Sequence, residues 1–409
     1  MTQPAARVLI LLENEPYPYD RRVSQIAAAL TAAGYEVTVA APATPDFGAP
    51  EEVLDGVRVL RFPAPPEGAG AAGYVREYWA GLRGLRRVAR RVEREQPPDL
   101  VIACNPPDFL FLAARAARRR GARLVFDHHD LSPELFESKF GRRGPFHRVL
   151  LAAERWSFRR ADAVLSTNDS YAEIARQRGG VAPERVFVVR NGPDPDRIRL
   201  VEPDPALRRG RPHLVAWIGR MSVQEGLDAV VEAADELRRR GRDDVAFALV
   251  GPGDAREGLV AEVRRRGLED AVTLPGRVDD DGVRRYISTA AVCLSVDPPG
   301  PLNDRSTMIK VLEYMAMGRA VVQTPLPEMV RLCGDATLFA RPRDPADLAD
   351  RIEELLDDPA RAADLGDRAR RRILDEGLMW PDQVPRLLDG VQTALSESSI
   401  ERGGSIKQA

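Results

Sequence analysis

The chain has 409 residues, a formal net charge of −2, 44% apolar side chains and 30% charged ones. This length predicts two or three domains with their own cores, and the apolar fraction excludes a mainly disordered chain. The near-zero net charge removes any general case for a nucleic-acid partner. No run approaches the roughly 20 uncharged apolar residues of a transmembrane helix, and residues 1–7 lack a signal-peptide pattern, so we expect a cytoplasmic protein.

Short apolar runs separated by helical stretches fill the first half of the chain. Such runs are typical of strands buried on both faces of a parallel sheet. Asp20 is placed to cap a helix over 21–33. The expected strands span 8–12, 37–40, 57–62, 100–103, 124–126, 163–166 and 186–189.

The stretch 191–212, rich in Pro and Asp, indicates a linker, and the same alternation restarts after it. Helices are expected at 226–240 and 307–317. Further strands are expected at 214–218, 246–250, 272–274, 292–296, 320–323 and 336–339. We therefore predict an α/β fold of two doubly wound Rossmann-like domains facing each other across a cleft. The expected parts are a domain at 1–200, a second at 211–378, a C-terminal helix at 379–397 packing back on the first domain, and a disordered tail at 398–409.

Gly219-Arg220-Met221-Ser222 follows an expected strand without completing the Gly-x-Gly-x-x-Gly pattern. The residues after the first strand also lack that pattern, which argues against a nicotinamide- or flavin-dependent dehydrogenase. An anion resting on backbone amides after the strand would be clamped by the Arg220 guanidinium. The alternative is an arginine on a solvated loop.

Segment 303–318 joins a capped helix start to a terminal Gly318. Asp304 or Ser306 can cap this helix, and Lys310 and Glu313 share one face of it. A lysine near a helix start opposes the macrodipole, a cost that a bound diphosphate would justify. Glu313 can accept two hydrogen bonds from ribose hydroxyls. The alternative is a surface Lys–Glu pair.

Asp127-His128-His129-Asp130 follows the expected strand 124–126, at the end where open sheets bind ligands. A structural histidine satisfied by Asp130 is one alternative. Metal ligation by the two histidines is a weaker one, because no third ligand stands at a helical spacing. Cys104, Cys293 and Cys333 are scattered, which argues against a Cys-rich zinc site.

Two basic segments, 74–94 and 147–160, combine an apolar stripe with several arginines. One interpretation is docking on an anionic membrane leaflet. The other is a pair of ordinary sheet-covering helices with arginine-rich outer faces.

Taken together and in order, these segments resemble the retaining GT-B glycosyltransferases of family 4, especially bacterial members of exopolysaccharide and O-antigen assembly. The resemblance covers nearly the whole chain. It is carried by Glu13-Asn14, Asp20 to Val23, Gly34 to Val39, His129-Asp130-Leu131, Val189 to Gly192, Gly219-Arg220-Met221, Val250 to Gly253, Pro275 to Val278 and Glu313 to Gly318.

The resemblance implies roles for individual residues. The implied catalytic groups are His129 beside the anomeric centre, Arg220 at the donor diphosphate and Glu313 at the ribose. From its place near the helix start we add Lys310 to this set. The implied donor-binding residues are Gly219, Arg277 and Val278 near the base, and Asp304, Arg305, Ser306, Thr307 and Met308 near the sugar. The implied cleft-lining residues are Asp20, Arg21, Asp130 and Asn191.

Two positions depart from the family pattern. Glu225 stands where the family has a phosphate-binding lysine, and Arg305 stands where it has a sugar-reading glutamate. We hypothesise that Lys310, with Arg305, replaces the lost cation, and that Asp304 takes over part of the sugar reading.

The implied activity is transfer of a sugar, with retention, from a nucleotide-diphosphate sugar to a hydroxyl of a lipid-linked glycan or polysaccharide precursor. A UDP-sugar is favoured over a GDP-sugar, and neither a cofactor nor a metal is expected. Asp194-x-Asp196 and Asp279 to Asp281 match turns or helix starts better than a metal motif. The alternatives are a natural-product glycosyltransferase with a soluble acceptor, a nucleotide-sugar epimerase, or a catalytically silent GT-B protein.

Overall fold

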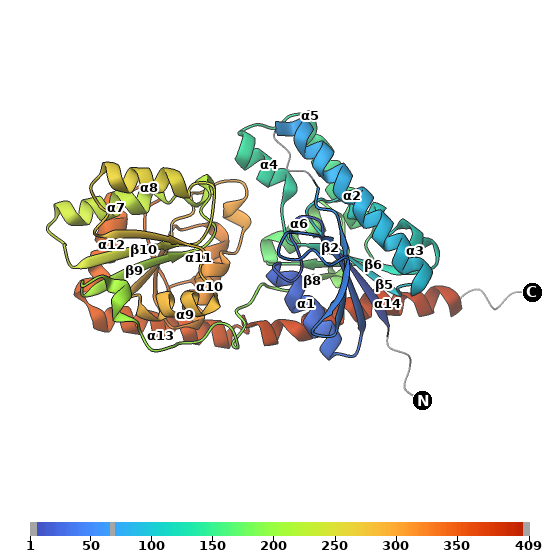
Figure 1. Ribbon diagram of the computed structural model, residues 1–409. Coiled ribbons are helices and arrows are strands. Elements are labelled where there is room, and N and C mark those ends of the chain that lie inside the picture. Colours follow the sequence, from blue (N-terminus) through green and yellow to red (C-terminus); the bar gives the residue numbers. More distant parts are fainter. Residues whose placement is uncertain (1–5, 66–69, 404–409) are drawn as a thin grey trace, which may run out of the picture. The chain divides into compact units, whose positions relative to one another are not determined.

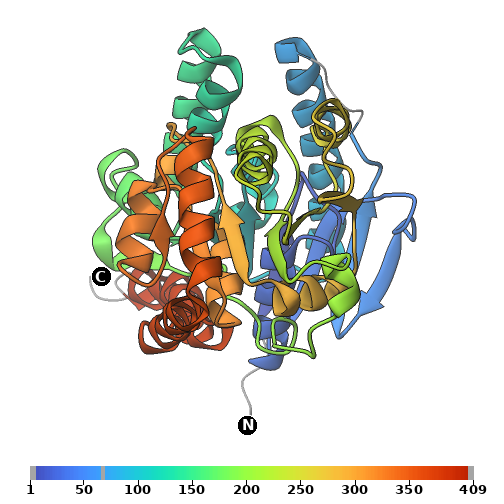
Figure 2. The same ribbon diagram turned by 90° about the vertical axis from the view of Figure 1, so that its left-hand side faces the viewer.

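The computed structural model describes residues 6–65 and 70–403, and the chain divides into two compact units (Figure 1). Unit 1 comprises Met1–Arg190 together with Val384–Ala409, and unit 2 comprises Asn191–Gln383. Each unit carries one sheet of mostly parallel strands between helices (Figures 1 and 2). The prediction of two doubly wound α/β units is therefore confirmed.

The sheet of unit 1 has eight strands in the order β3-β4-β2-β1-β5-β6-β7-β8. They are β1 (Arg7–Leu11), β2 (Glu36–Pro42), β3 (Glu51–Leu54), β4 (Val57–Phe62), β5 (Leu100–Cys104), β6 (Arg123–His128), β7 (Ala163–Ser166) and β8 (Val186–Val188). The sequence analysis missed β3, which pairs antiparallel with β4 through the turn Asp55-Gly56. Both turn residues have positive φ, 50° and 82°, and such an Asp-Gly pair is a strong hairpin signal.

Helices of 5 to 26 residues cover both faces of this sheet. They are α1 (Arg21–Ala32), α2 (Gly70–Glu95), α3 (Arg115–Arg119), α4 (Ser132–Phe140), α5 (Pro145–Arg160) and α6 (Asp169–Gln177). Leu82, Leu85 and Val92 of α2 are buried in one cluster with strand residues. The chain returns at its C-terminus as α14 (Trp380–Gly403), which extends beyond the expected end at 397, and residues 404–409 lie outside the described residues.

Unit 2 has six parallel strands in the order β11-β10-β9-β12-β13-β14. They are β9 (His213–Ile218), β10 (Val245–Val250), β11 (Val272–Gly276), β12 (Val292–Ser295), β13 (Ala320–Gln323) and β14 (Leu338–Phe339). Its helices are α7 (Asp228–Arg239), α8 (Arg256–Arg265), α9 (Asp280–Thr289), α10 (Ile309–Ala316), α11 (Pro327–Cys333), α12 (Pro345–Asp357) and α13 (Pro359–Asp375).

Alternate residues of β9 point to two separate cores, as the pleat requires. Leu214, Ala216 and Ile218 pack with α9, α10, α11 and α13. Val215 and Trp217 pack on the opposite face with α7, α8 and α12. Because both faces are covered, the strand reads as a continuous apolar run.

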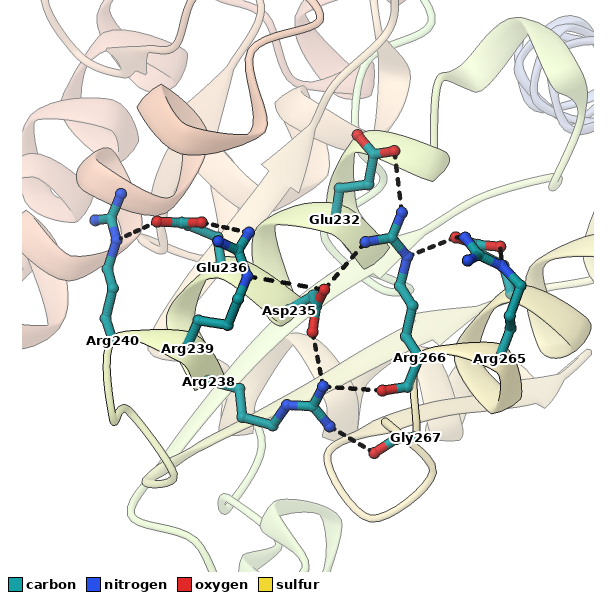
Figure 3. Close-up of polar contacts among 10 residues, drawn as sticks. Glu232, Asp235, Glu236, Arg238, Arg239, Arg240, Arg265, Arg266 and Gly267 are labelled. Carbon is teal, nitrogen blue, oxygen red and sulfur yellow. Dashed lines mark hydrogen bonds and ion pairs between the residues drawn. The ribbon is translucent and has the colours of Figure 1, made fainter.

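Arginine side chains bind α7 to α8 on the surface of unit 2 (Figure 3). Arg266 lies 3.1 Å from Asp235 and 3.3 Å from Glu232. Arg238 donates to Asp235 and to the carbonyl oxygens of Arg266 and Gly267. The planar guanidinium fork presents five donors in a fixed geometry and so holds several acceptors at once.

The starts of two helices in unit 2 differ from the sequence prediction. The helix expected at 226 begins at Asp228, after a 3-10 turn over Val223–Glu225 and a Gly226 with φ of 67°. The helix expected at 307 begins at Ile309 and has no side-chain cap. Asp304 instead accepts from the Gly300 amide, and the Ser306 hydroxyl donates to the Leu302 carbonyl.

Each sheet has a point where the order of strands reverses, and ligands of open α/β sheets bind outside the carboxyl ends of the strands there. In unit 1 this point lies between β1 and β5, and in unit 2 it lies between β9 and β12. These two places locate the candidate sites. Within residues 6–65 and 70–403, no helix combines the length and apolarity needed to cross a bilayer.

Candidate functional site

Backbone hydrogen bonds join three loops at the carboxyl ends of β9, β10 and β11. The Gly219 amide donates to the Val250 carbonyl at 3.0 Å, and the Gly251 amide donates to the Gly276 carbonyl at 2.9 Å. Gly251 has φ of 136°, and a Cβ there would collide with the Gly219 backbone. The loops therefore approach closely because glycine stands at both contact positions.

Lys310, from the first turn of α10, reaches the reversal point between β9 and β12. Its Nζ lies 2.5 Å from Glu225 Oε2, in the loop after β9, and 2.9 Å from Asp297 Oδ1, just after β12. The ammonium group also stands 5.0 Å from the ring centroid of Trp217. The side chains of Lys310 and Asp297 are 12% and 3% exposed, whereas that of Glu225 is 24% exposed.

The charges of this cluster shift one another's pKa values. Burial alone would lower the pKa of Lys310, but the carboxylates of Asp297 and Glu225 outweigh burial and raise it. Burial, reinforced by the charge of Asp297, raises the pKa of Glu225 to about 7. Ser295 Oγ donates to Asp297 Oδ2 at 2.5 Å. The cluster thus holds a permanent cation beside a carboxyl group that titrates near neutral pH.

Buried contacts fix α10 against the end of β9. The Ile218 amide donates to the hydroxyl of Tyr314, which is fully buried, at 2.8 Å. Because Tyr314 lies one turn beyond Lys310, this anchor sets where the lysine side chain begins.

Glu313 does not pair with Lys310, so the interpretation as a surface Lys–Glu pair is wrong. Glu313 is buried and forms an ion pair with Arg197, which also lies 3.2 Å from Asp280. Sequence reasoning missed Arg197, since no local pattern ties the linker to α10.

The other expected donor-binding residues of unit 2 differ in exposure. Arg220 and Arg277 are exposed where they follow β9 and β11, and Arg305 is exposed with Nη1 donating to the Pro301 carbonyl at 2.9 Å. Val278 packs against the core. Gly219, Asp304, Ser306 and Thr307 are partly buried, and Met308 is buried.

In unit 1, three side chains from two elements form a buried chain of contacts that ends at His129. Asp127, fully buried at the end of β6, accepts from Arg22 Nε at 3.0 Å and from Nη2 at 2.6 Å. Its Oδ2 lies 2.9 Å from His129 Nδ1. Arg22 Nη1 donates to the Val189 carbonyl at 2.8 Å. The partner of His129 is therefore Asp127, and the alternative of a histidine satisfied by Asp130 is wrong.

Asn105, in the loop after β5, clamps the backbone that follows. Its Oδ1 accepts from the amides of His129 at 2.8 Å and Asp130 at 3.1 Å. Its Nδ2 donates to the Asp130 carbonyl and to Asp108 Oδ1, both at 2.7 Å. One side chain from the loop after β5 thus fixes the backbone after β6, at the reversal point of unit 1.

Electrostatics strengthen this arrangement. Burial alone would raise the pKa of Asp127, but Arg22 and His129 hold it well below its usual range. Burial alone would lower the pKa of His129, but the hydrogen bond and charge of Asp127 raise it. Burial also raises the pKa of Asp130, which is partly exposed.

His128 and His129 do not act as a pair. His128 is fully buried and its ring packs against Phe126, Phe158 and Tyr171. Among the described residues, no cluster of three or more His, Cys, Asp or Glu side chains suits a metal ion.

The three residues from Asp20 to Arg22 have different environments: one caps a helix, one is exposed to solvent and one is buried. Asp20 caps α1 by accepting from the Val23 amide at 2.9 Å. Arg21 is exposed and Arg22 is buried. Helical spacing indicates this difference, since Arg22 lies four residues before the buried Ile26. Asn191, the first residue of unit 2, is partly buried.

Comparisons with known proteins agree with this architecture. The family model of the glycosyl transferase 4-like domain matches residues 19–192, and that of glycosyl transferases group 1 matches residues 212–358. A 2-deoxystreptamine glucosyltransferase of Streptomyces kanamyceticus is 27% identical over 351 residues, covering 83% of this chain and 89% of that protein. A glycogen synthase of Mycobacterium tuberculosis is 25% identical over 394 residues, covering 90% of each chain.

Among solved structures, Anabaena HepE in complex with UDP-glucose superposes with a TM-score of 0.70 at 18% identity, covering 96% of this chain and 99% of that one. The fold is therefore GT-B, and the chain belongs to the family-4 glycosyltransferases. It is a glycosyltransferase enzyme, as the sequence analysis expected.

Proposed function

We propose that this enzyme transfers a sugar, with retention, from a nucleotide-diphosphate sugar to a hydroxyl of a lipid-linked glycan or polysaccharide precursor. The observation that carries the donor half is the cation of Lys310 at the strand-order reversal of unit 2. Positive charge from Arg220, which is exposed beside that point, and from Lys310, whose ammonium group Asp297 and Glu225 also contact, would stabilise a departing diphosphate.

The loss of the family lysine at position 225 supports a specific role for Lys310. Its ammonium group contacts the very side chain that replaces the family lysine, at 2.5 Å. A cation supplied from α10 therefore stands beside the loop that would otherwise carry it. Arg220, exposed after Gly219, supplies the second positive charge. Glu313, held by Arg197, is the acceptor for ribose hydroxyls.

A titration with nucleotides tests the donor half directly. Isothermal titration with UDP, GDP and their glucose conjugates is expected to give the tightest binding with a uridine ligand, as the UDP-glucose in the HepE complex favours. Arg220→Ala is expected to weaken binding at least tenfold, because it removes a charge-assisted contact of about 1.5–3 kcal/mol. Arg239→Ala, on the outer side of α7, serves as the control. Absence of binding to every nucleotide would contradict the proposal.

The choice of acceptor rests on the outer faces of α2 and α5. The inner stripe of α2 is buried, as expected of a sheet-covering helix, but Trp79 of α2 and Trp156 of α5 are each 54% exposed. Exposed arginines flank both, among them Arg76, Arg83, Arg155 and Arg159. Exposed tryptophans beside basic residues suit the interface of an anionic membrane, where a lipid-linked acceptor resides.

Vesicle flotation separates this acceptor class from a soluble one. Binding to vesicles with 30% or so anionic lipid, weakened by salt and by Trp79→Ala with Trp156→Ala, is expected for peripheral docking. Salt-insensitive or absent binding would favour the second candidate, a natural-product transferase with a soluble acceptor, which the similarity to the 2-deoxystreptamine enzyme supports.

The reaction is proposed to need no metal or cofactor. Transfer is expected to continue in excess EDTA, and activity abolished by chelator and restored by Mn²⁺ would contradict this. Product analysis distinguishes transfer from the remaining alternatives. An epimerase would convert the donor into an epimeric nucleotide-sugar and form no glycoside, and a silent protein would bind donor without turnover.

A further inference from the structure

The buried contacts of His129 suggest a role for an arginine that neither the fold nor the comparisons assign. Asp127 is fully buried and receives two guanidinium nitrogens of Arg22 on one side and His129 Nδ1 on the other. The Arg22 side chain is itself only 4% exposed, and the His129 side chain is 11% exposed. A buried arginine thus reaches the histidine through one shared carboxylate.

We propose that Arg22 is a positioning residue, which orients Asp127 so that its carboxylate fixes the His129 ring with Nδ1 as a hydrogen-bond donor and leaves Nε2 for a substrate group. This inference rests on the proposed function for the identity of that group, a sugar hydroxyl or the donor diphosphate. It names Arg22 and Asp127 as residues that act through His129 and do not touch substrate.

The geometry of the guanidinium supports orientation as well as charge. Nε and Nη2 both donate to the same carboxylate, while Nη1 donates to the Val189 carbonyl at 2.8 Å. This contact ties α1 to the backbone just after β8. The carboxylate is held on one side by two nitrogens of a guanidinium that is itself anchored on Val189, and this hold favours the orientation that faces Nδ1.

Backbone contacts complete the frame around the ring. Asn105 Oδ1 receives the amides of His129 and Asp130, which fixes the main chain from which the ring extends. A second hydrogen bond on the opposite side of an imidazole sets which nitrogen carries the proton. Asp127 plays that part here, in the way that an outer carboxylate orients a catalytic histidine in hydrolases.

The charged groups that face His129 come from two elements. Asp20 and Arg22 belong to the start of α1, while Asp127 and Asp130 flank the histidine on its own segment. Arg22 offsets the negative charge of Asp127. Without that offset, the imidazolium form gains a stronger counter-charge and the titration moves to higher pH.

Nuclear magnetic resonance of labelled histidine tests the proposal without substrate. The His129 signal is assigned by its loss in His129→Asn. Asp127→Asn is expected to move its titration to lower pH and to alter the tautomer reported by the ring nitrogens. Arg22→Met is expected to move the titration to higher pH. Arg21→Met removes the same charge from the exposed side of α1, and the His129 titration is expected to stay where it is.

Steady-state kinetics give a second measurement. The conservative variant Arg22→Lys distinguishes loss of positioning from loss of the fold. Arg22→Met is expected to lower kcat about tenfold or more with donor KM little changed, and Arg22→Lys, which keeps the charge without the fork, is expected to recover part of kcat. A His129 titration and tautomer in Arg22→Met identical to those of wild type would overturn the proposal, whatever Asp127→Asn does. If wild type transfers no sugar, the proposed function fails, while the titrations still decide the role of Arg22.

Discussion

Replacing Lys310 by methionine keeps an unbranched side chain, one atom shorter, and removes the charge that separates two carboxylates. Asp297 would remain 3% exposed with Glu225 beside it and no counter-ion. Removing one partner of a buried ion pair costs about 3–5 kcal/mol. We expect the lower end, about 3 kcal/mol, because Glu225 is 24% exposed and can relieve the repulsion by taking up a proton.

Thermal unfolding measures this loss. At roughly 2–4 °C per kcal/mol for a unit of this size, Lys310→Met is expected to lower the Tm of unit 2 by roughly 6–12 °C. Lys139→Met, on the exposed side of α4, is the matched control. Adding Glu225→Gln and Asp297→Asn to Lys310→Met is expected to restore most of the loss. A Lys310→Met protein within 2 °C or so of wild type would refute the cluster as a stabilising, desolvated one.

Three further changes test other parts of the structure. Burial raises the pKa of Glu13 from 4.5 to about 8, so this group stabilises the fold below pH 4.5 and loses that contribution as pH rises through 8. Glu13→Gln is therefore expected to raise stability at pH 8 by on the order of 3 kcal/mol and to change it little at pH 4, as denaturant titrations can verify. Gly253→Ala is expected to lower stability by about 1–3 kcal/mol and to weaken donor binding, because φ is 153° and a Cβ would meet the Met221 backbone. Gly258→Ala, in open space on α8, is its control, and equal calorimetric behaviour of the two variants would contradict the argument. Truncation after Gln383 is expected to make unit 1 aggregate on expression, since it removes buried Leu387 and Val391, and a monodisperse truncated chain would count against that.

Much of the fold could be predicted from the sequence because parallel strands covered on both faces read as plain apolar runs. β4 and β7 coincide with their expected bounds. β3 was missed because its residues, Glu51 to Leu54, are too polar for that rule. It is an edge strand that is held by a hairpin and not by burial on two faces. The Asp-Gly turn is therefore the sequence signal that could have predicted it.

The sequence singled out residues that lie at the carboxyl ends of the strands, but it did not predict which side chains they contact. Lys310 was singled out from its place in a helix, yet its partners Glu225 and Asp297 lie 85 and 13 residues away in the chain. Arg22 is 105 residues from Asp127. Side chains so far apart in the sequence meet because the order of strands in the sheet brings their loops together. The periodicity within one segment does not reveal that order, so the contacts could not be predicted.

The course of α14 bears on how the protein is made. Its later part packs Gly390 against Leu165 and Phe187 of β7 and β8. Unit 1 is therefore built from both ends of the chain, with all of unit 2 translated in between. A nascent chain emerges from its N-terminus, so the first sheet to leave the ribosome waits for the last helix before its β7–β8 side is covered. Until then these strands are covered on the face that packs against α5 and α6, and the unit begun first is completed last.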